Sequence, residues 1–406
     1  MSISTKNNLS MFNFTTLWFG AAISVAEILA GGLLAPLGFK MGLLAILLGH
    51  LVGTTLLVLA GVIGTTERIP ALVSTRISFG SYGSYVFSVL NVLQLLGWTA
   101  VMIIVGARSV NEITKTLWFF DHQTVWSLVI GVFIMLWVWL GKDIGWKKAN
   151  NIAVILLFLL TMVLSVIIFR NNELFDKLGS GEMAFGLGLE LAVVMPLSWL
   201  PLIADYTRFA KTKRGGAWGS WLGYFIGSSW MFMIGLGAAI VYSNPDPSAM
   251  LLSLNLGIIA LGIIVLATVT TTFLDAYSAG VTFLNIFPKM NEKLVALVLT
   301  AIGTGLAIVV NIEEYESFLY AIGSVFAPLF AILLTDYFLL KNKKIQTDLL
   351  ANWATLALCA FGTILYYQFI NLNFVLGATI PVMLIISIIH LITWRLTVKW
   401  KYVRRS

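Results

Sequence analysis

Long apolar stretches, separated by short polar connections, follow one another along almost the whole chain. Each stretch, as a helix, is long enough to cross about 30 Å of hydrocarbon. The pattern predicts an all-α polytopic membrane protein with twelve transmembrane helices. Their expected ranges are 14–36, 42–65, 85–110, 123–141, 149–169, 184–205, 216–242, 256–284, 293–311, 316–340, 349–370 and 374–396.

Composition and charge support a membrane protein. Of the 406 residues, 59% are hydrophobic and only 11% are charged, whereas soluble domains carry about 25% charged residues. In the twelve-span topology, twenty of the 25 Lys and Arg residues fall on the side of both termini. This bias predicts a plasma-membrane protein with both termini in the cytoplasm. The net charge of +7 then reflects topology, and we expect the lipid bilayer as a partner but no nucleic acid and no obligate protein partner.

The first and sixth predicted spans carry residues that weaken a helix. The first contains Glu27, followed by Gly31 and Gly32, which we expect to let the helix loosen. The sixth contains Pro196 and Pro201, and each proline removes a backbone hydrogen bond. Irregular backbone at membrane depth survives where it lines a cavity. Two interrupted spans, five apart, therefore predict two five-helix units of inverted topology, with the binding site at the breaks.

Polar side chains in two further spans are candidates for ligand binding. In the eighth span, the threonines 270–272 precede Asp275. Hydroxyl and carbonyl oxygens suit a hard cation such as Na⁺, although a threonine in a membrane helix also bonds back to its own helix. In the third span, Gln94 and Trp98 are four residues apart and share one face. An indole that stacks on a flat ring, beside an amide, is suited to a small heteroaromatic substrate.

Enzyme chemistry has little support in the sequence. No His, Cys, Asp or Glu cluster has metal-ligand spacing, and no phosphate loop or nucleophile–base arrangement stands out. The single cysteine, Cys359, excludes an internal disulfide. His50 and His390 lie within predicted spans, where we expect packing or hydrogen bonding rather than a proton relay. The sequence therefore favours a transporter over an enzyme.

Several motifs, taken in order and spacing, resemble the nucleobase–cation–symport family, which includes the cytosine and hydantoin permeases. They are RISFGSYGSY (76–85), GW (97–98), ADYTRF (204–209), the threonine run followed by AYSAG in the eighth span, and FLYAIGSVFAPLFAILLTDYFL (318–339). The resemblance covers nearly the whole chain. It implies a leucine-transporter-type fold with two inverted five-helix repeats and two additional C-terminal helices.

Mapped onto this chain, that fold predicts five regions. They are a cytoplasmic N-terminus (1–13), a first five-helix repeat (14–170), a second inverted repeat (184–340), two extra helices (349–396) and a basic cytoplasmic tail (397–406).

The resemblance, together with the candidates above, also implies two sets of binding residues. The sodium site would use the carbonyls of Gly20, Ile23 and Ala267 and the hydroxyls of Thr270 and Thr271. The substrate site would use Ser24, Glu27, Gln94, Trp98, Ser198, Trp199, Thr272 and Asp275.

Three departures from relatives bear on the substrate. Pro196 stands where relatives place a second stacking aromatic residue, so Trp199 is the expected substitute. Thr272 stands where the cytosine permease has an asparagine, and Glu27 replaces a small residue. The pocket is therefore not expected to be tuned to cytosine itself.

The predicted function is import of a pyrimidine-like base by Na⁺ symport through alternating access. The stretches SVAEILAGGLLAPLG and MPLSWLPLIADYTR look most like the branch assigned to hydroxymethylpyrimidine transport, which serves thiamine precursor salvage. One alternative is a cytosine, purine or hydantoin permease coupled to H⁺. A more distant one is an amino-acid transporter of the same fold, in which an ionised Glu27 would repel the substrate carboxylate. A channel would need a continuous polar stripe or charged ring, and none is visible.

Glu27 carries the most specific hypothesis. A protonated carboxyl, or a carboxylate facing a protonated ring, matches the donor and acceptor edge of an aminopyrimidine in two hydrogen bonds. The alternative is that Glu27 bonds to a neighbouring helix and has a structural role.

Overall fold

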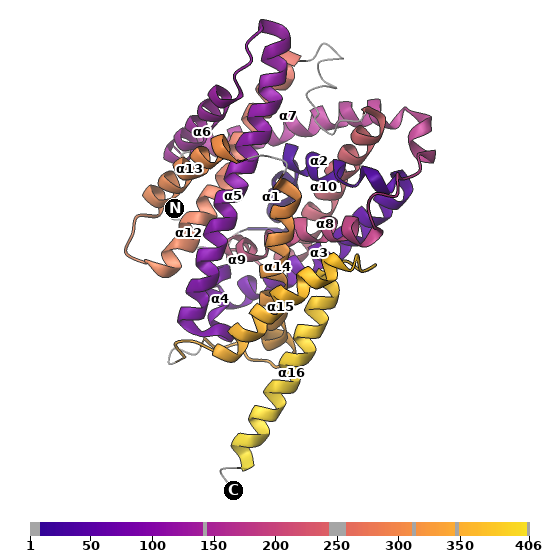
Figure 1. Ribbon diagram of the computed structural model, residues 1–406. Coiled ribbons are helices and arrows are strands. Elements are labelled where there is room, and N and C mark those ends of the chain that lie inside the picture. The colour runs from indigo at the N-terminus through magenta and orange to yellow at the C-terminus, as the bar shows by residue number, and fades with distance from the viewer. Residues whose placement is uncertain (1–8, 141–143, 243–256, 311–313, 346–348, 404–406) are drawn as a thin grey trace.

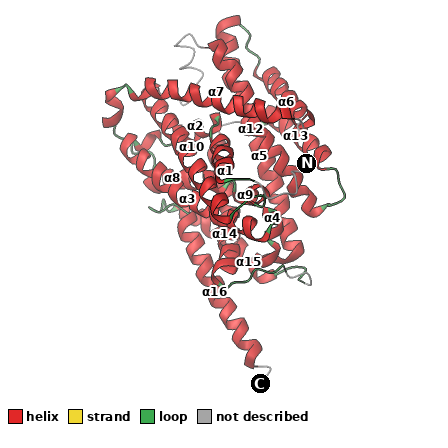
Figure 2. Cartoon of the chain, turned by 180° about the vertical axis from the view of Figure 1, so that it is seen from behind, coloured by secondary structure: helices red, strands yellow, loops and turns green. Residues whose placement is uncertain are grey.

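The computed structural model describes residues 9–140, 144–242, 257–310, 314–345 and 349–403, and nearly all of them are helical (Figures 1 and 2). The first part contains α1 (Met11–Ala22), α2 (Val25–Gly32), η1 (Ala35–Leu37), α3 (Phe39–Glu67), α4 (Ala71–Ser74), α5 (Arg76–Trp118), α6 (Gln123–Leu140), α7 (Ile144–Phe169) and η2 (Asn172–Asp176). The second part contains α8 (Phe185–Leu197), α9 (Leu200–Thr207), α10 (Lys213–Tyr242), α12 (Gly257–Ile286), α13 (Glu292–Val309), α14 (Tyr315–Leu334), η4 (Thr335–Leu339), α15 (Trp353–Asn371) and α16 (Thr379–Val403).

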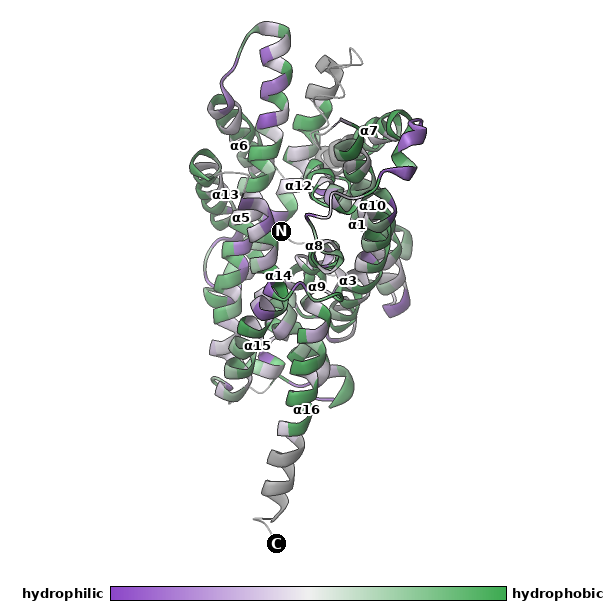
Figure 3. Cartoon of the chain, turned by 45° about the vertical axis from the view of Figure 1, so that its right-hand side comes forward, coloured by the Kyte–Doolittle hydropathy of each residue, from purple (hydrophilic) through white to green (hydrophobic). Residues whose placement is uncertain are grey.

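These helices have the length and polarity of membrane spans. Within the described residues, nine are long and apolar enough to cross a bilayer, and the count is ten if the bent pair α1–α2 forms one span. Two shorter apolar helices cover Val154–Phe169 and Thr379–Trp394. Figure 3 shows long hydrophobic stretches along the helices, with hydrophilic colouring concentrated near the connections. The all-helical membrane fold is confirmed, while the number twelve and the inverted repeat stay predictions.

Burial separates central helices from peripheral ones. In the most apolar window of the Phe185–Thr207 span, 89% of the residues are buried, compared with 22% for α15 and 28% for α6. Most exposed side chains on the peripheral helices are apolar, for example Phe133 on α6 and Ile364 on α15. Such faces are suited to lipid, and the central helices are left to line the site.

The first span is broken at Ile23 and Ser24. α1 and α2 meet there at a bend of 59°. Ser24 has an extended backbone (φ −142°, ψ 155°), and its hydroxyl oxygen accepts a hydrogen bond from the Glu27 N–H at 3.3 Å. Ser24 is therefore the N-cap of α2, a role for which serine is well suited because its oxygen satisfies a free backbone donor.

The expectation that Gly31 and Gly32 loosen the first span is wrong. Both glycines are buried in the last turn of α2, beside α10. A Cβ atom at Gly31 would lie 2.2 Å from the carbonyl oxygen of Phe232. The missing side chain thus permits close packing of α2 on α10, and the break lies about two turns earlier.

The predicted interruption of the sixth span is confirmed, but the backbone there departs only slightly from a helix. Pro196 lies at the end of α8 and Pro201 in the first turn of α9. Between them, Ser198 and Trp199 keep right-handed helical backbone angles. The Trp199 N–H also donates to the Pro196 carbonyl at 3.2 Å, so little of the backbone at this break is left unpaired.

Candidate functional site

A small cavity lies where the two breaks meet, and we call it the central pocket. Its volume is about 20 Å³. Two carboxylates, two hydroxyl groups, two indole rings, two methionines and two alanines form its wall. The lining residues are Ala21, Ser24, Ala26, Glu27, Trp98, Met102, Met195, Trp199, Thr271 and Asp275.

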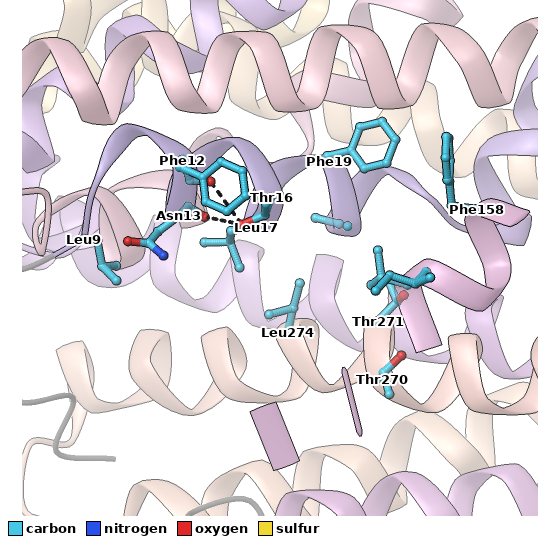
Figure 4. A pocket seen from close by; sticks show the side chains of 14 residues that line it. Leu9, Phe12, Asn13, Thr16, Leu17, Phe19, Phe158, Thr270, Thr271 and Leu274 are labelled. Carbon is cyan, nitrogen blue, oxygen red and sulfur yellow. Dashed lines mark hydrogen bonds between the residues drawn. The ribbon is translucent and has the colours of Figure 1, made fainter. Parts of the chain in front are cut away.

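A second and larger cavity of about 580 Å³ lies between α1, α7 and α12, and we call it the vestibule (Figure 4). It extends from Leu9, next to the start of α1, to Thr271 on α12. Ala21 and Thr271 line both cavities. The vestibule therefore leads from the N-terminal end of α1 to the edge of the central pocket.

Five of the predicted substrate residues come together at the central pocket. Ser24 and Glu27 come from the first span, Trp98 from α5, Trp199 from the α8–α9 break and Asp275 from α12. All are buried apart from Trp199, which is partly exposed.

The two tryptophans in the pocket wall are held by aromatic packing against neighbouring helices. Trp98 packs edge-on against Phe318, with ring centroids 5.4 Å apart, and against Tyr315 at 6.1 Å. Trp199 packs edge-on against Trp18, with centroids 5.6 Å apart. Edge-to-face contacts of this kind orient the rings. Both indoles therefore have defined positions in the pocket wall.

The other three predicted substrate residues do not line the central pocket. The Gln94 amide nitrogen donates to the Ser198 carbonyl at 2.6 Å, and the Ser198 hydroxyl donates to the Met195 carbonyl at 2.7 Å. The Thr272 hydroxyl donates to the Thr268 carbonyl of its own helix at 2.7 Å. The Gln94 amide oxygen is buried and has no partner in the described part of the chain. In this conformation, these polar groups bind protein atoms.

The two carboxylates of the pocket differ in their partners. Glu27 is only 3% exposed, and its oxygens contact the Tyr224 hydroxyl at 2.9 Å and the Ser228 hydroxyl at 2.6 Å. Asp275 is 5% exposed and has no hydrogen-bond or ion-pair partner among the described residues. Within the described part of the chain, Asp275 is thus the pocket carboxylate that is left free to accept hydrogen bonds from a ligand.

The predicted sodium residues lie at the C-terminal end of α1, where the first span breaks, and on α12. Gly20, Thr270 and Thr271 line the vestibule. Ile23 is the C-cap residue of α1, and the Ala267 carbonyl accepts a hydrogen bond from the Thr270 hydroxyl at 3.0 Å. The end of a helix leaves carbonyl groups without partners in the next turn. Carbonyl and hydroxyl oxygens are the donors that a hard cation prefers, so this residue set fits Na⁺.

Several pocket residues were not among the predicted ones. Met102 lies four residues after Trp98 on the same helix, so the spacing that singled out Gln94 could have indicated it. Met195 directly precedes Pro196, and Ala21 and Ala26 flank the first break. None of these carries a polar side chain, and the sequence offers no local signal that places Met195 at the pocket.

Together, a helical membrane fold, two interrupted spans and a buried pocket between them define a membrane transporter. The model of a family described as "Permease for cytosine/purines, uracil, thiamine, allantoin" matches residues 4–392. The chain belongs to this permease family. The resemblance to nucleobase–cation symporters is therefore confirmed, as is the prediction of a transporter rather than an enzyme.

Named relatives agree with the family. The chain is 22% identical over 412 residues to the hydantoin permease of Microbacterium maritypicum, which covers 92% of this chain and 84% of the relative. It is 25% identical over 372 residues to the purine-cytosine permease fcyB of Emericella nidulans, covering 83% of this chain and 72% of the relative.

Solved structures of the transporter Mhp1 share the fold. The inward-facing conformation matches with a TM-score of 0.80 at 20% identity, covering 97% of this chain and 91% of Mhp1. The closed conformation, with bromovinylhydantoin bound, matches with a TM-score of 0.81 at 20% identity, covering 95% of this chain and 92% of Mhp1.

Proposed function

We propose that this protein imports a pyrimidine-like base, with hydroxymethylpyrimidine favoured, by Na⁺ symport through alternating access. The observation that carries the proposal is the central pocket, which is lined by Trp98, Trp199 and Asp275, whose carboxylate has no partner among the described residues. An indole can stack on a flat ring, and a carboxylate accepts hydrogen bonds from ring or exocyclic N–H groups. These groups match the faces and the edge of an aminopyrimidine.

The size of the central pocket supports a transport cycle with moving helices. A volume of about 20 Å³ leaves room for about one water molecule, since roughly 10–15 Å³ is enough for one, and it is far too small for a heterocyclic ring. A base can enter only if the wall moves apart. The bent α1–α2 span and the adjoining vestibule of about 580 Å³ favour motion of the first span. The names of the relatives, which include purine, cytosine, uracil and hydantoin permeases, support a heterocyclic substrate.

We propose Na⁺ as the coupling ion, bound by the oxygens of Gly20, Ile23, Ala267, Thr270 and Thr271. Thr271 lines both the vestibule and the central pocket, so an ion at this position would lie beside the substrate. Each Na⁺ driven by ~100 mV supplies ~2.3 kcal/mol, which sustains roughly fiftyfold accumulation of the base.

A proton-coupled cytosine, purine or hydantoin permease is the second candidate. It is favoured by one observation, the buried carboxylate of Asp275 in the pocket wall, which could carry a proton across with the base. An amino-acid substrate is disfavoured, because its carboxylate would face Glu27 and Asp275 with no Lys or Arg among the described lining residues.

Uptake into proteoliposomes tests the proposal. Hydroxymethylpyrimidine, cytosine, uracil, adenine and hydantoin would be offered under an imposed Na⁺ gradient, a pH gradient or neither. We expect hydroxymethylpyrimidine to accumulate with the Na⁺ gradient and the other bases to compete weakly. Accumulation that follows only the pH gradient would favour the second candidate, and no uptake of any base would refute both.

We also propose that both termini face the cytoplasm at the plasma membrane, because the side that carries the termini holds most of the Lys and Arg residues. Single cysteines at Glu314 and Lys343 would be introduced after replacing the buried Cys359. An impermeant thiol reagent should label position 314 in intact cells and position 343 only after permeabilisation. The reverse pattern would invert the topology.

A further inference from the structure

A buried chain of hydrogen bonds leads from the central pocket into the space between α2, α3 and α10. Glu27 Oε2 lies 2.6 Å from Ser228 Oγ, and Ser228 Oγ lies 2.6 Å from His50 Nε2. On the far side of the imidazole, His50 Nδ1 lies 2.9 Å from the Ile46 carbonyl oxygen. All three side chains are almost completely buried. We call Glu27, Ser228 and His50 the relay.

The contacts of the relay need one more hydrogen than is present when Glu27 is an ionised carboxylate and His50 is a neutral imidazole. The Ile46 carbonyl can only accept, so His50 Nδ1 must carry a hydrogen. The two remaining contacts each need one hydrogen, and the Ser228 hydroxyl supplies only one of the two. The other is bound either to Glu27 Oε2 or to His50 Nε2, and this assignment follows from the network.

Both arrangements have zero net charge. In the first, Glu27 is a carboxylic acid that donates to Ser228, and Ser228 donates to a neutral His50. In the second, His50 is an imidazolium that donates to Ser228, and Ser228 donates to a Glu27 carboxylate. The two differ by the shift of two protons along two short hydrogen bonds. Separating charges in a buried site is unfavourable, so the first arrangement is expected when the pocket holds no cationic or strongly donating group.

The titratable groups around the relay do not supply the missing hydrogen. The Tyr224 hydroxyl on α10 donates to Glu27 Oε1, and the Tyr315 hydroxyl on α14 donates to the Ala26 carbonyl at 3.3 Å. Asp275 on α12 lines the same pocket as Glu27. The acidic residue of α8, Glu190, bonds to Tyr366 and Thr379. Facing His50 is the Phe232 ring, with centroids 4.7 Å apart.

We propose that the relay sets the charge of Glu27 to match the bound base. In both arrangements the hydrogen between Glu27 Oε2 and Ser228 Oγ is used in the bond that joins them. Toward the pocket, Glu27 can therefore only accept hydrogen bonds. Glu27 therefore recognises a hydrogen-bond donor on the ligand, namely the amino group or the protonated ring nitrogen of an aminopyrimidine. When such a group binds, the Glu27 proton passes to Ser228 Oγ while the Ser228 proton passes to His50 Nε2. Glu27 then faces the ligand as a carboxylate, without uptake of a proton from solvent.

This inference rests on the proposed function for its ligand, but the proton count does not. Infrared difference spectroscopy detects the C=O stretch of a protonated carboxyl group, and Glu27→Gln identifies which part of that signal belongs to Glu27. We expect this signal in the ligand-free wild type near neutral pH. Adding a saturating aminopyrimidine should diminish it and increase the carboxylate signal, while unsubstituted pyrimidine, which has no N–H donor, should leave it unchanged.

Ser228→Ala is the decisive variant, because it removes the link between Glu27 and His50. In this variant the protonated-carboxyl signal should persist when the aminopyrimidine binds, and affinity should fall by about tenfold or more, since a hydrogen bond to a charged group is lost. Ser229→Ala is the matched control. Ser229 is the adjacent buried residue of α10, and its hydroxyl has no partner in the described chain, so both readouts should stay as in the wild type.

A His50→Phe variant gives an independent check, because Glu27 then has no base to receive its proton and should remain protonated with ligand bound. A ligand-free wild type without the Glu27 signal, or a signal that ligand does not change while affinity still depends on Glu27, would overturn the relay. If no base quenches tryptophan fluorescence or binds at all, the proposed function fails, while the ligand-free signal still reports on the proton count.

Discussion

The first and sixth spans are both interrupted near the site, yet the two breaks have opposite characters. The first contains no proline at the break and bends by 59° at Ile23 and Ser24. The sixth contains Pro196 and Pro201 but continues as one 23-residue span. The central pocket touches both breaks. The vestibule adjoins only the first, whereas at the sixth the Gln94 amide donates to the Ser198 carbonyl.

The difference shows that non-helical backbone angles expose backbone groups to a cavity more effectively than proline residues do. Proline in the first turn of a helix replaces an N–H that would have no partner, and its fixed φ suits the helix. The extended backbone of Ser24 instead changes the direction of the chain. Carbonyl groups at the end of α1 are then left for a ligand or an ion. Four substitutions test this comparison.

Gly31→Val should have the largest effect, because the first break depends on α2 packing closely on α10. The new Cβ would lie 2.2 Å from the Phe232 carbonyl oxygen and 2.5 Å from its Cα, so backbone atoms would have to move. We expect destabilisation by about 3 kcal/mol or more, seen as loss of folded protein or of thermal stability in detergent. Gly305→Val is the control, since a Cβ there meets no atom within 4 Å. Equal losses in both variants would show that helix propensity, and not packing, is responsible.

Thr271→Ala should weaken cation binding by about tenfold, which corresponds to ~1.4 kcal/mol. It should also lower substrate affinity, because the two sites are linked. Thr272→Ala removes a neighbouring hydroxyl that bonds to its own helix and should leave both affinities unchanged. Tryptophan fluorescence titrations with Na⁺ and with the base would measure the two effects. The assignment of Thr271 fails if the two variants behave alike.

Gln94→Leu tests the break in the sixth span, between α8 and α9. Removing the amide leaves the buried Ser198 carbonyl without its donor, which should destabilise the protein by about 1–2 kcal/mol without a change in Na⁺ affinity. Thermal unfolding and cation titration would be compared on the same samples. A larger loss of substrate affinity than of stability would instead indicate that Gln94 turns toward the substrate during transport.

Ser24→Ala should have the smallest effect of the four, a loss of about 1 kcal/mol from removal of the α2 N-cap. Ser24→Asn keeps a capping oxygen and should restore most of the stability. Thermal unfolding of both variants would measure the difference. If neither variant changes stability, the direction of α2 is set by its contacts with α10 and not by the cap.

Much of the architecture could be predicted from the sequence, because the bilayer imposes a simple rule. Apolar stretches of sufficient length become membrane helices, and residues such as Pro196 and Pro201 mark where one of them is interrupted. The family resemblance, together with residue types and helical spacing, also indicated Ser24, Glu27, Trp98, Trp199 and Asp275, and the structure brings these five to one pocket.

Only the tertiary structure decided which side chains bind one another. Glu27 contacts Tyr224 and Ser228 on a helix about 200 positions away. Through Ser228 it is linked to His50, for which the sequence indicated only packing or hydrogen bonding. Asp275 has no comparable partner among the described residues. A helix that is apolar nearly all round does not reveal which face it turns toward its neighbours. The rotation and depth of each helix depend on close packing at residues such as Gly31, so the partners of a buried polar group emerge only when the helices are assembled.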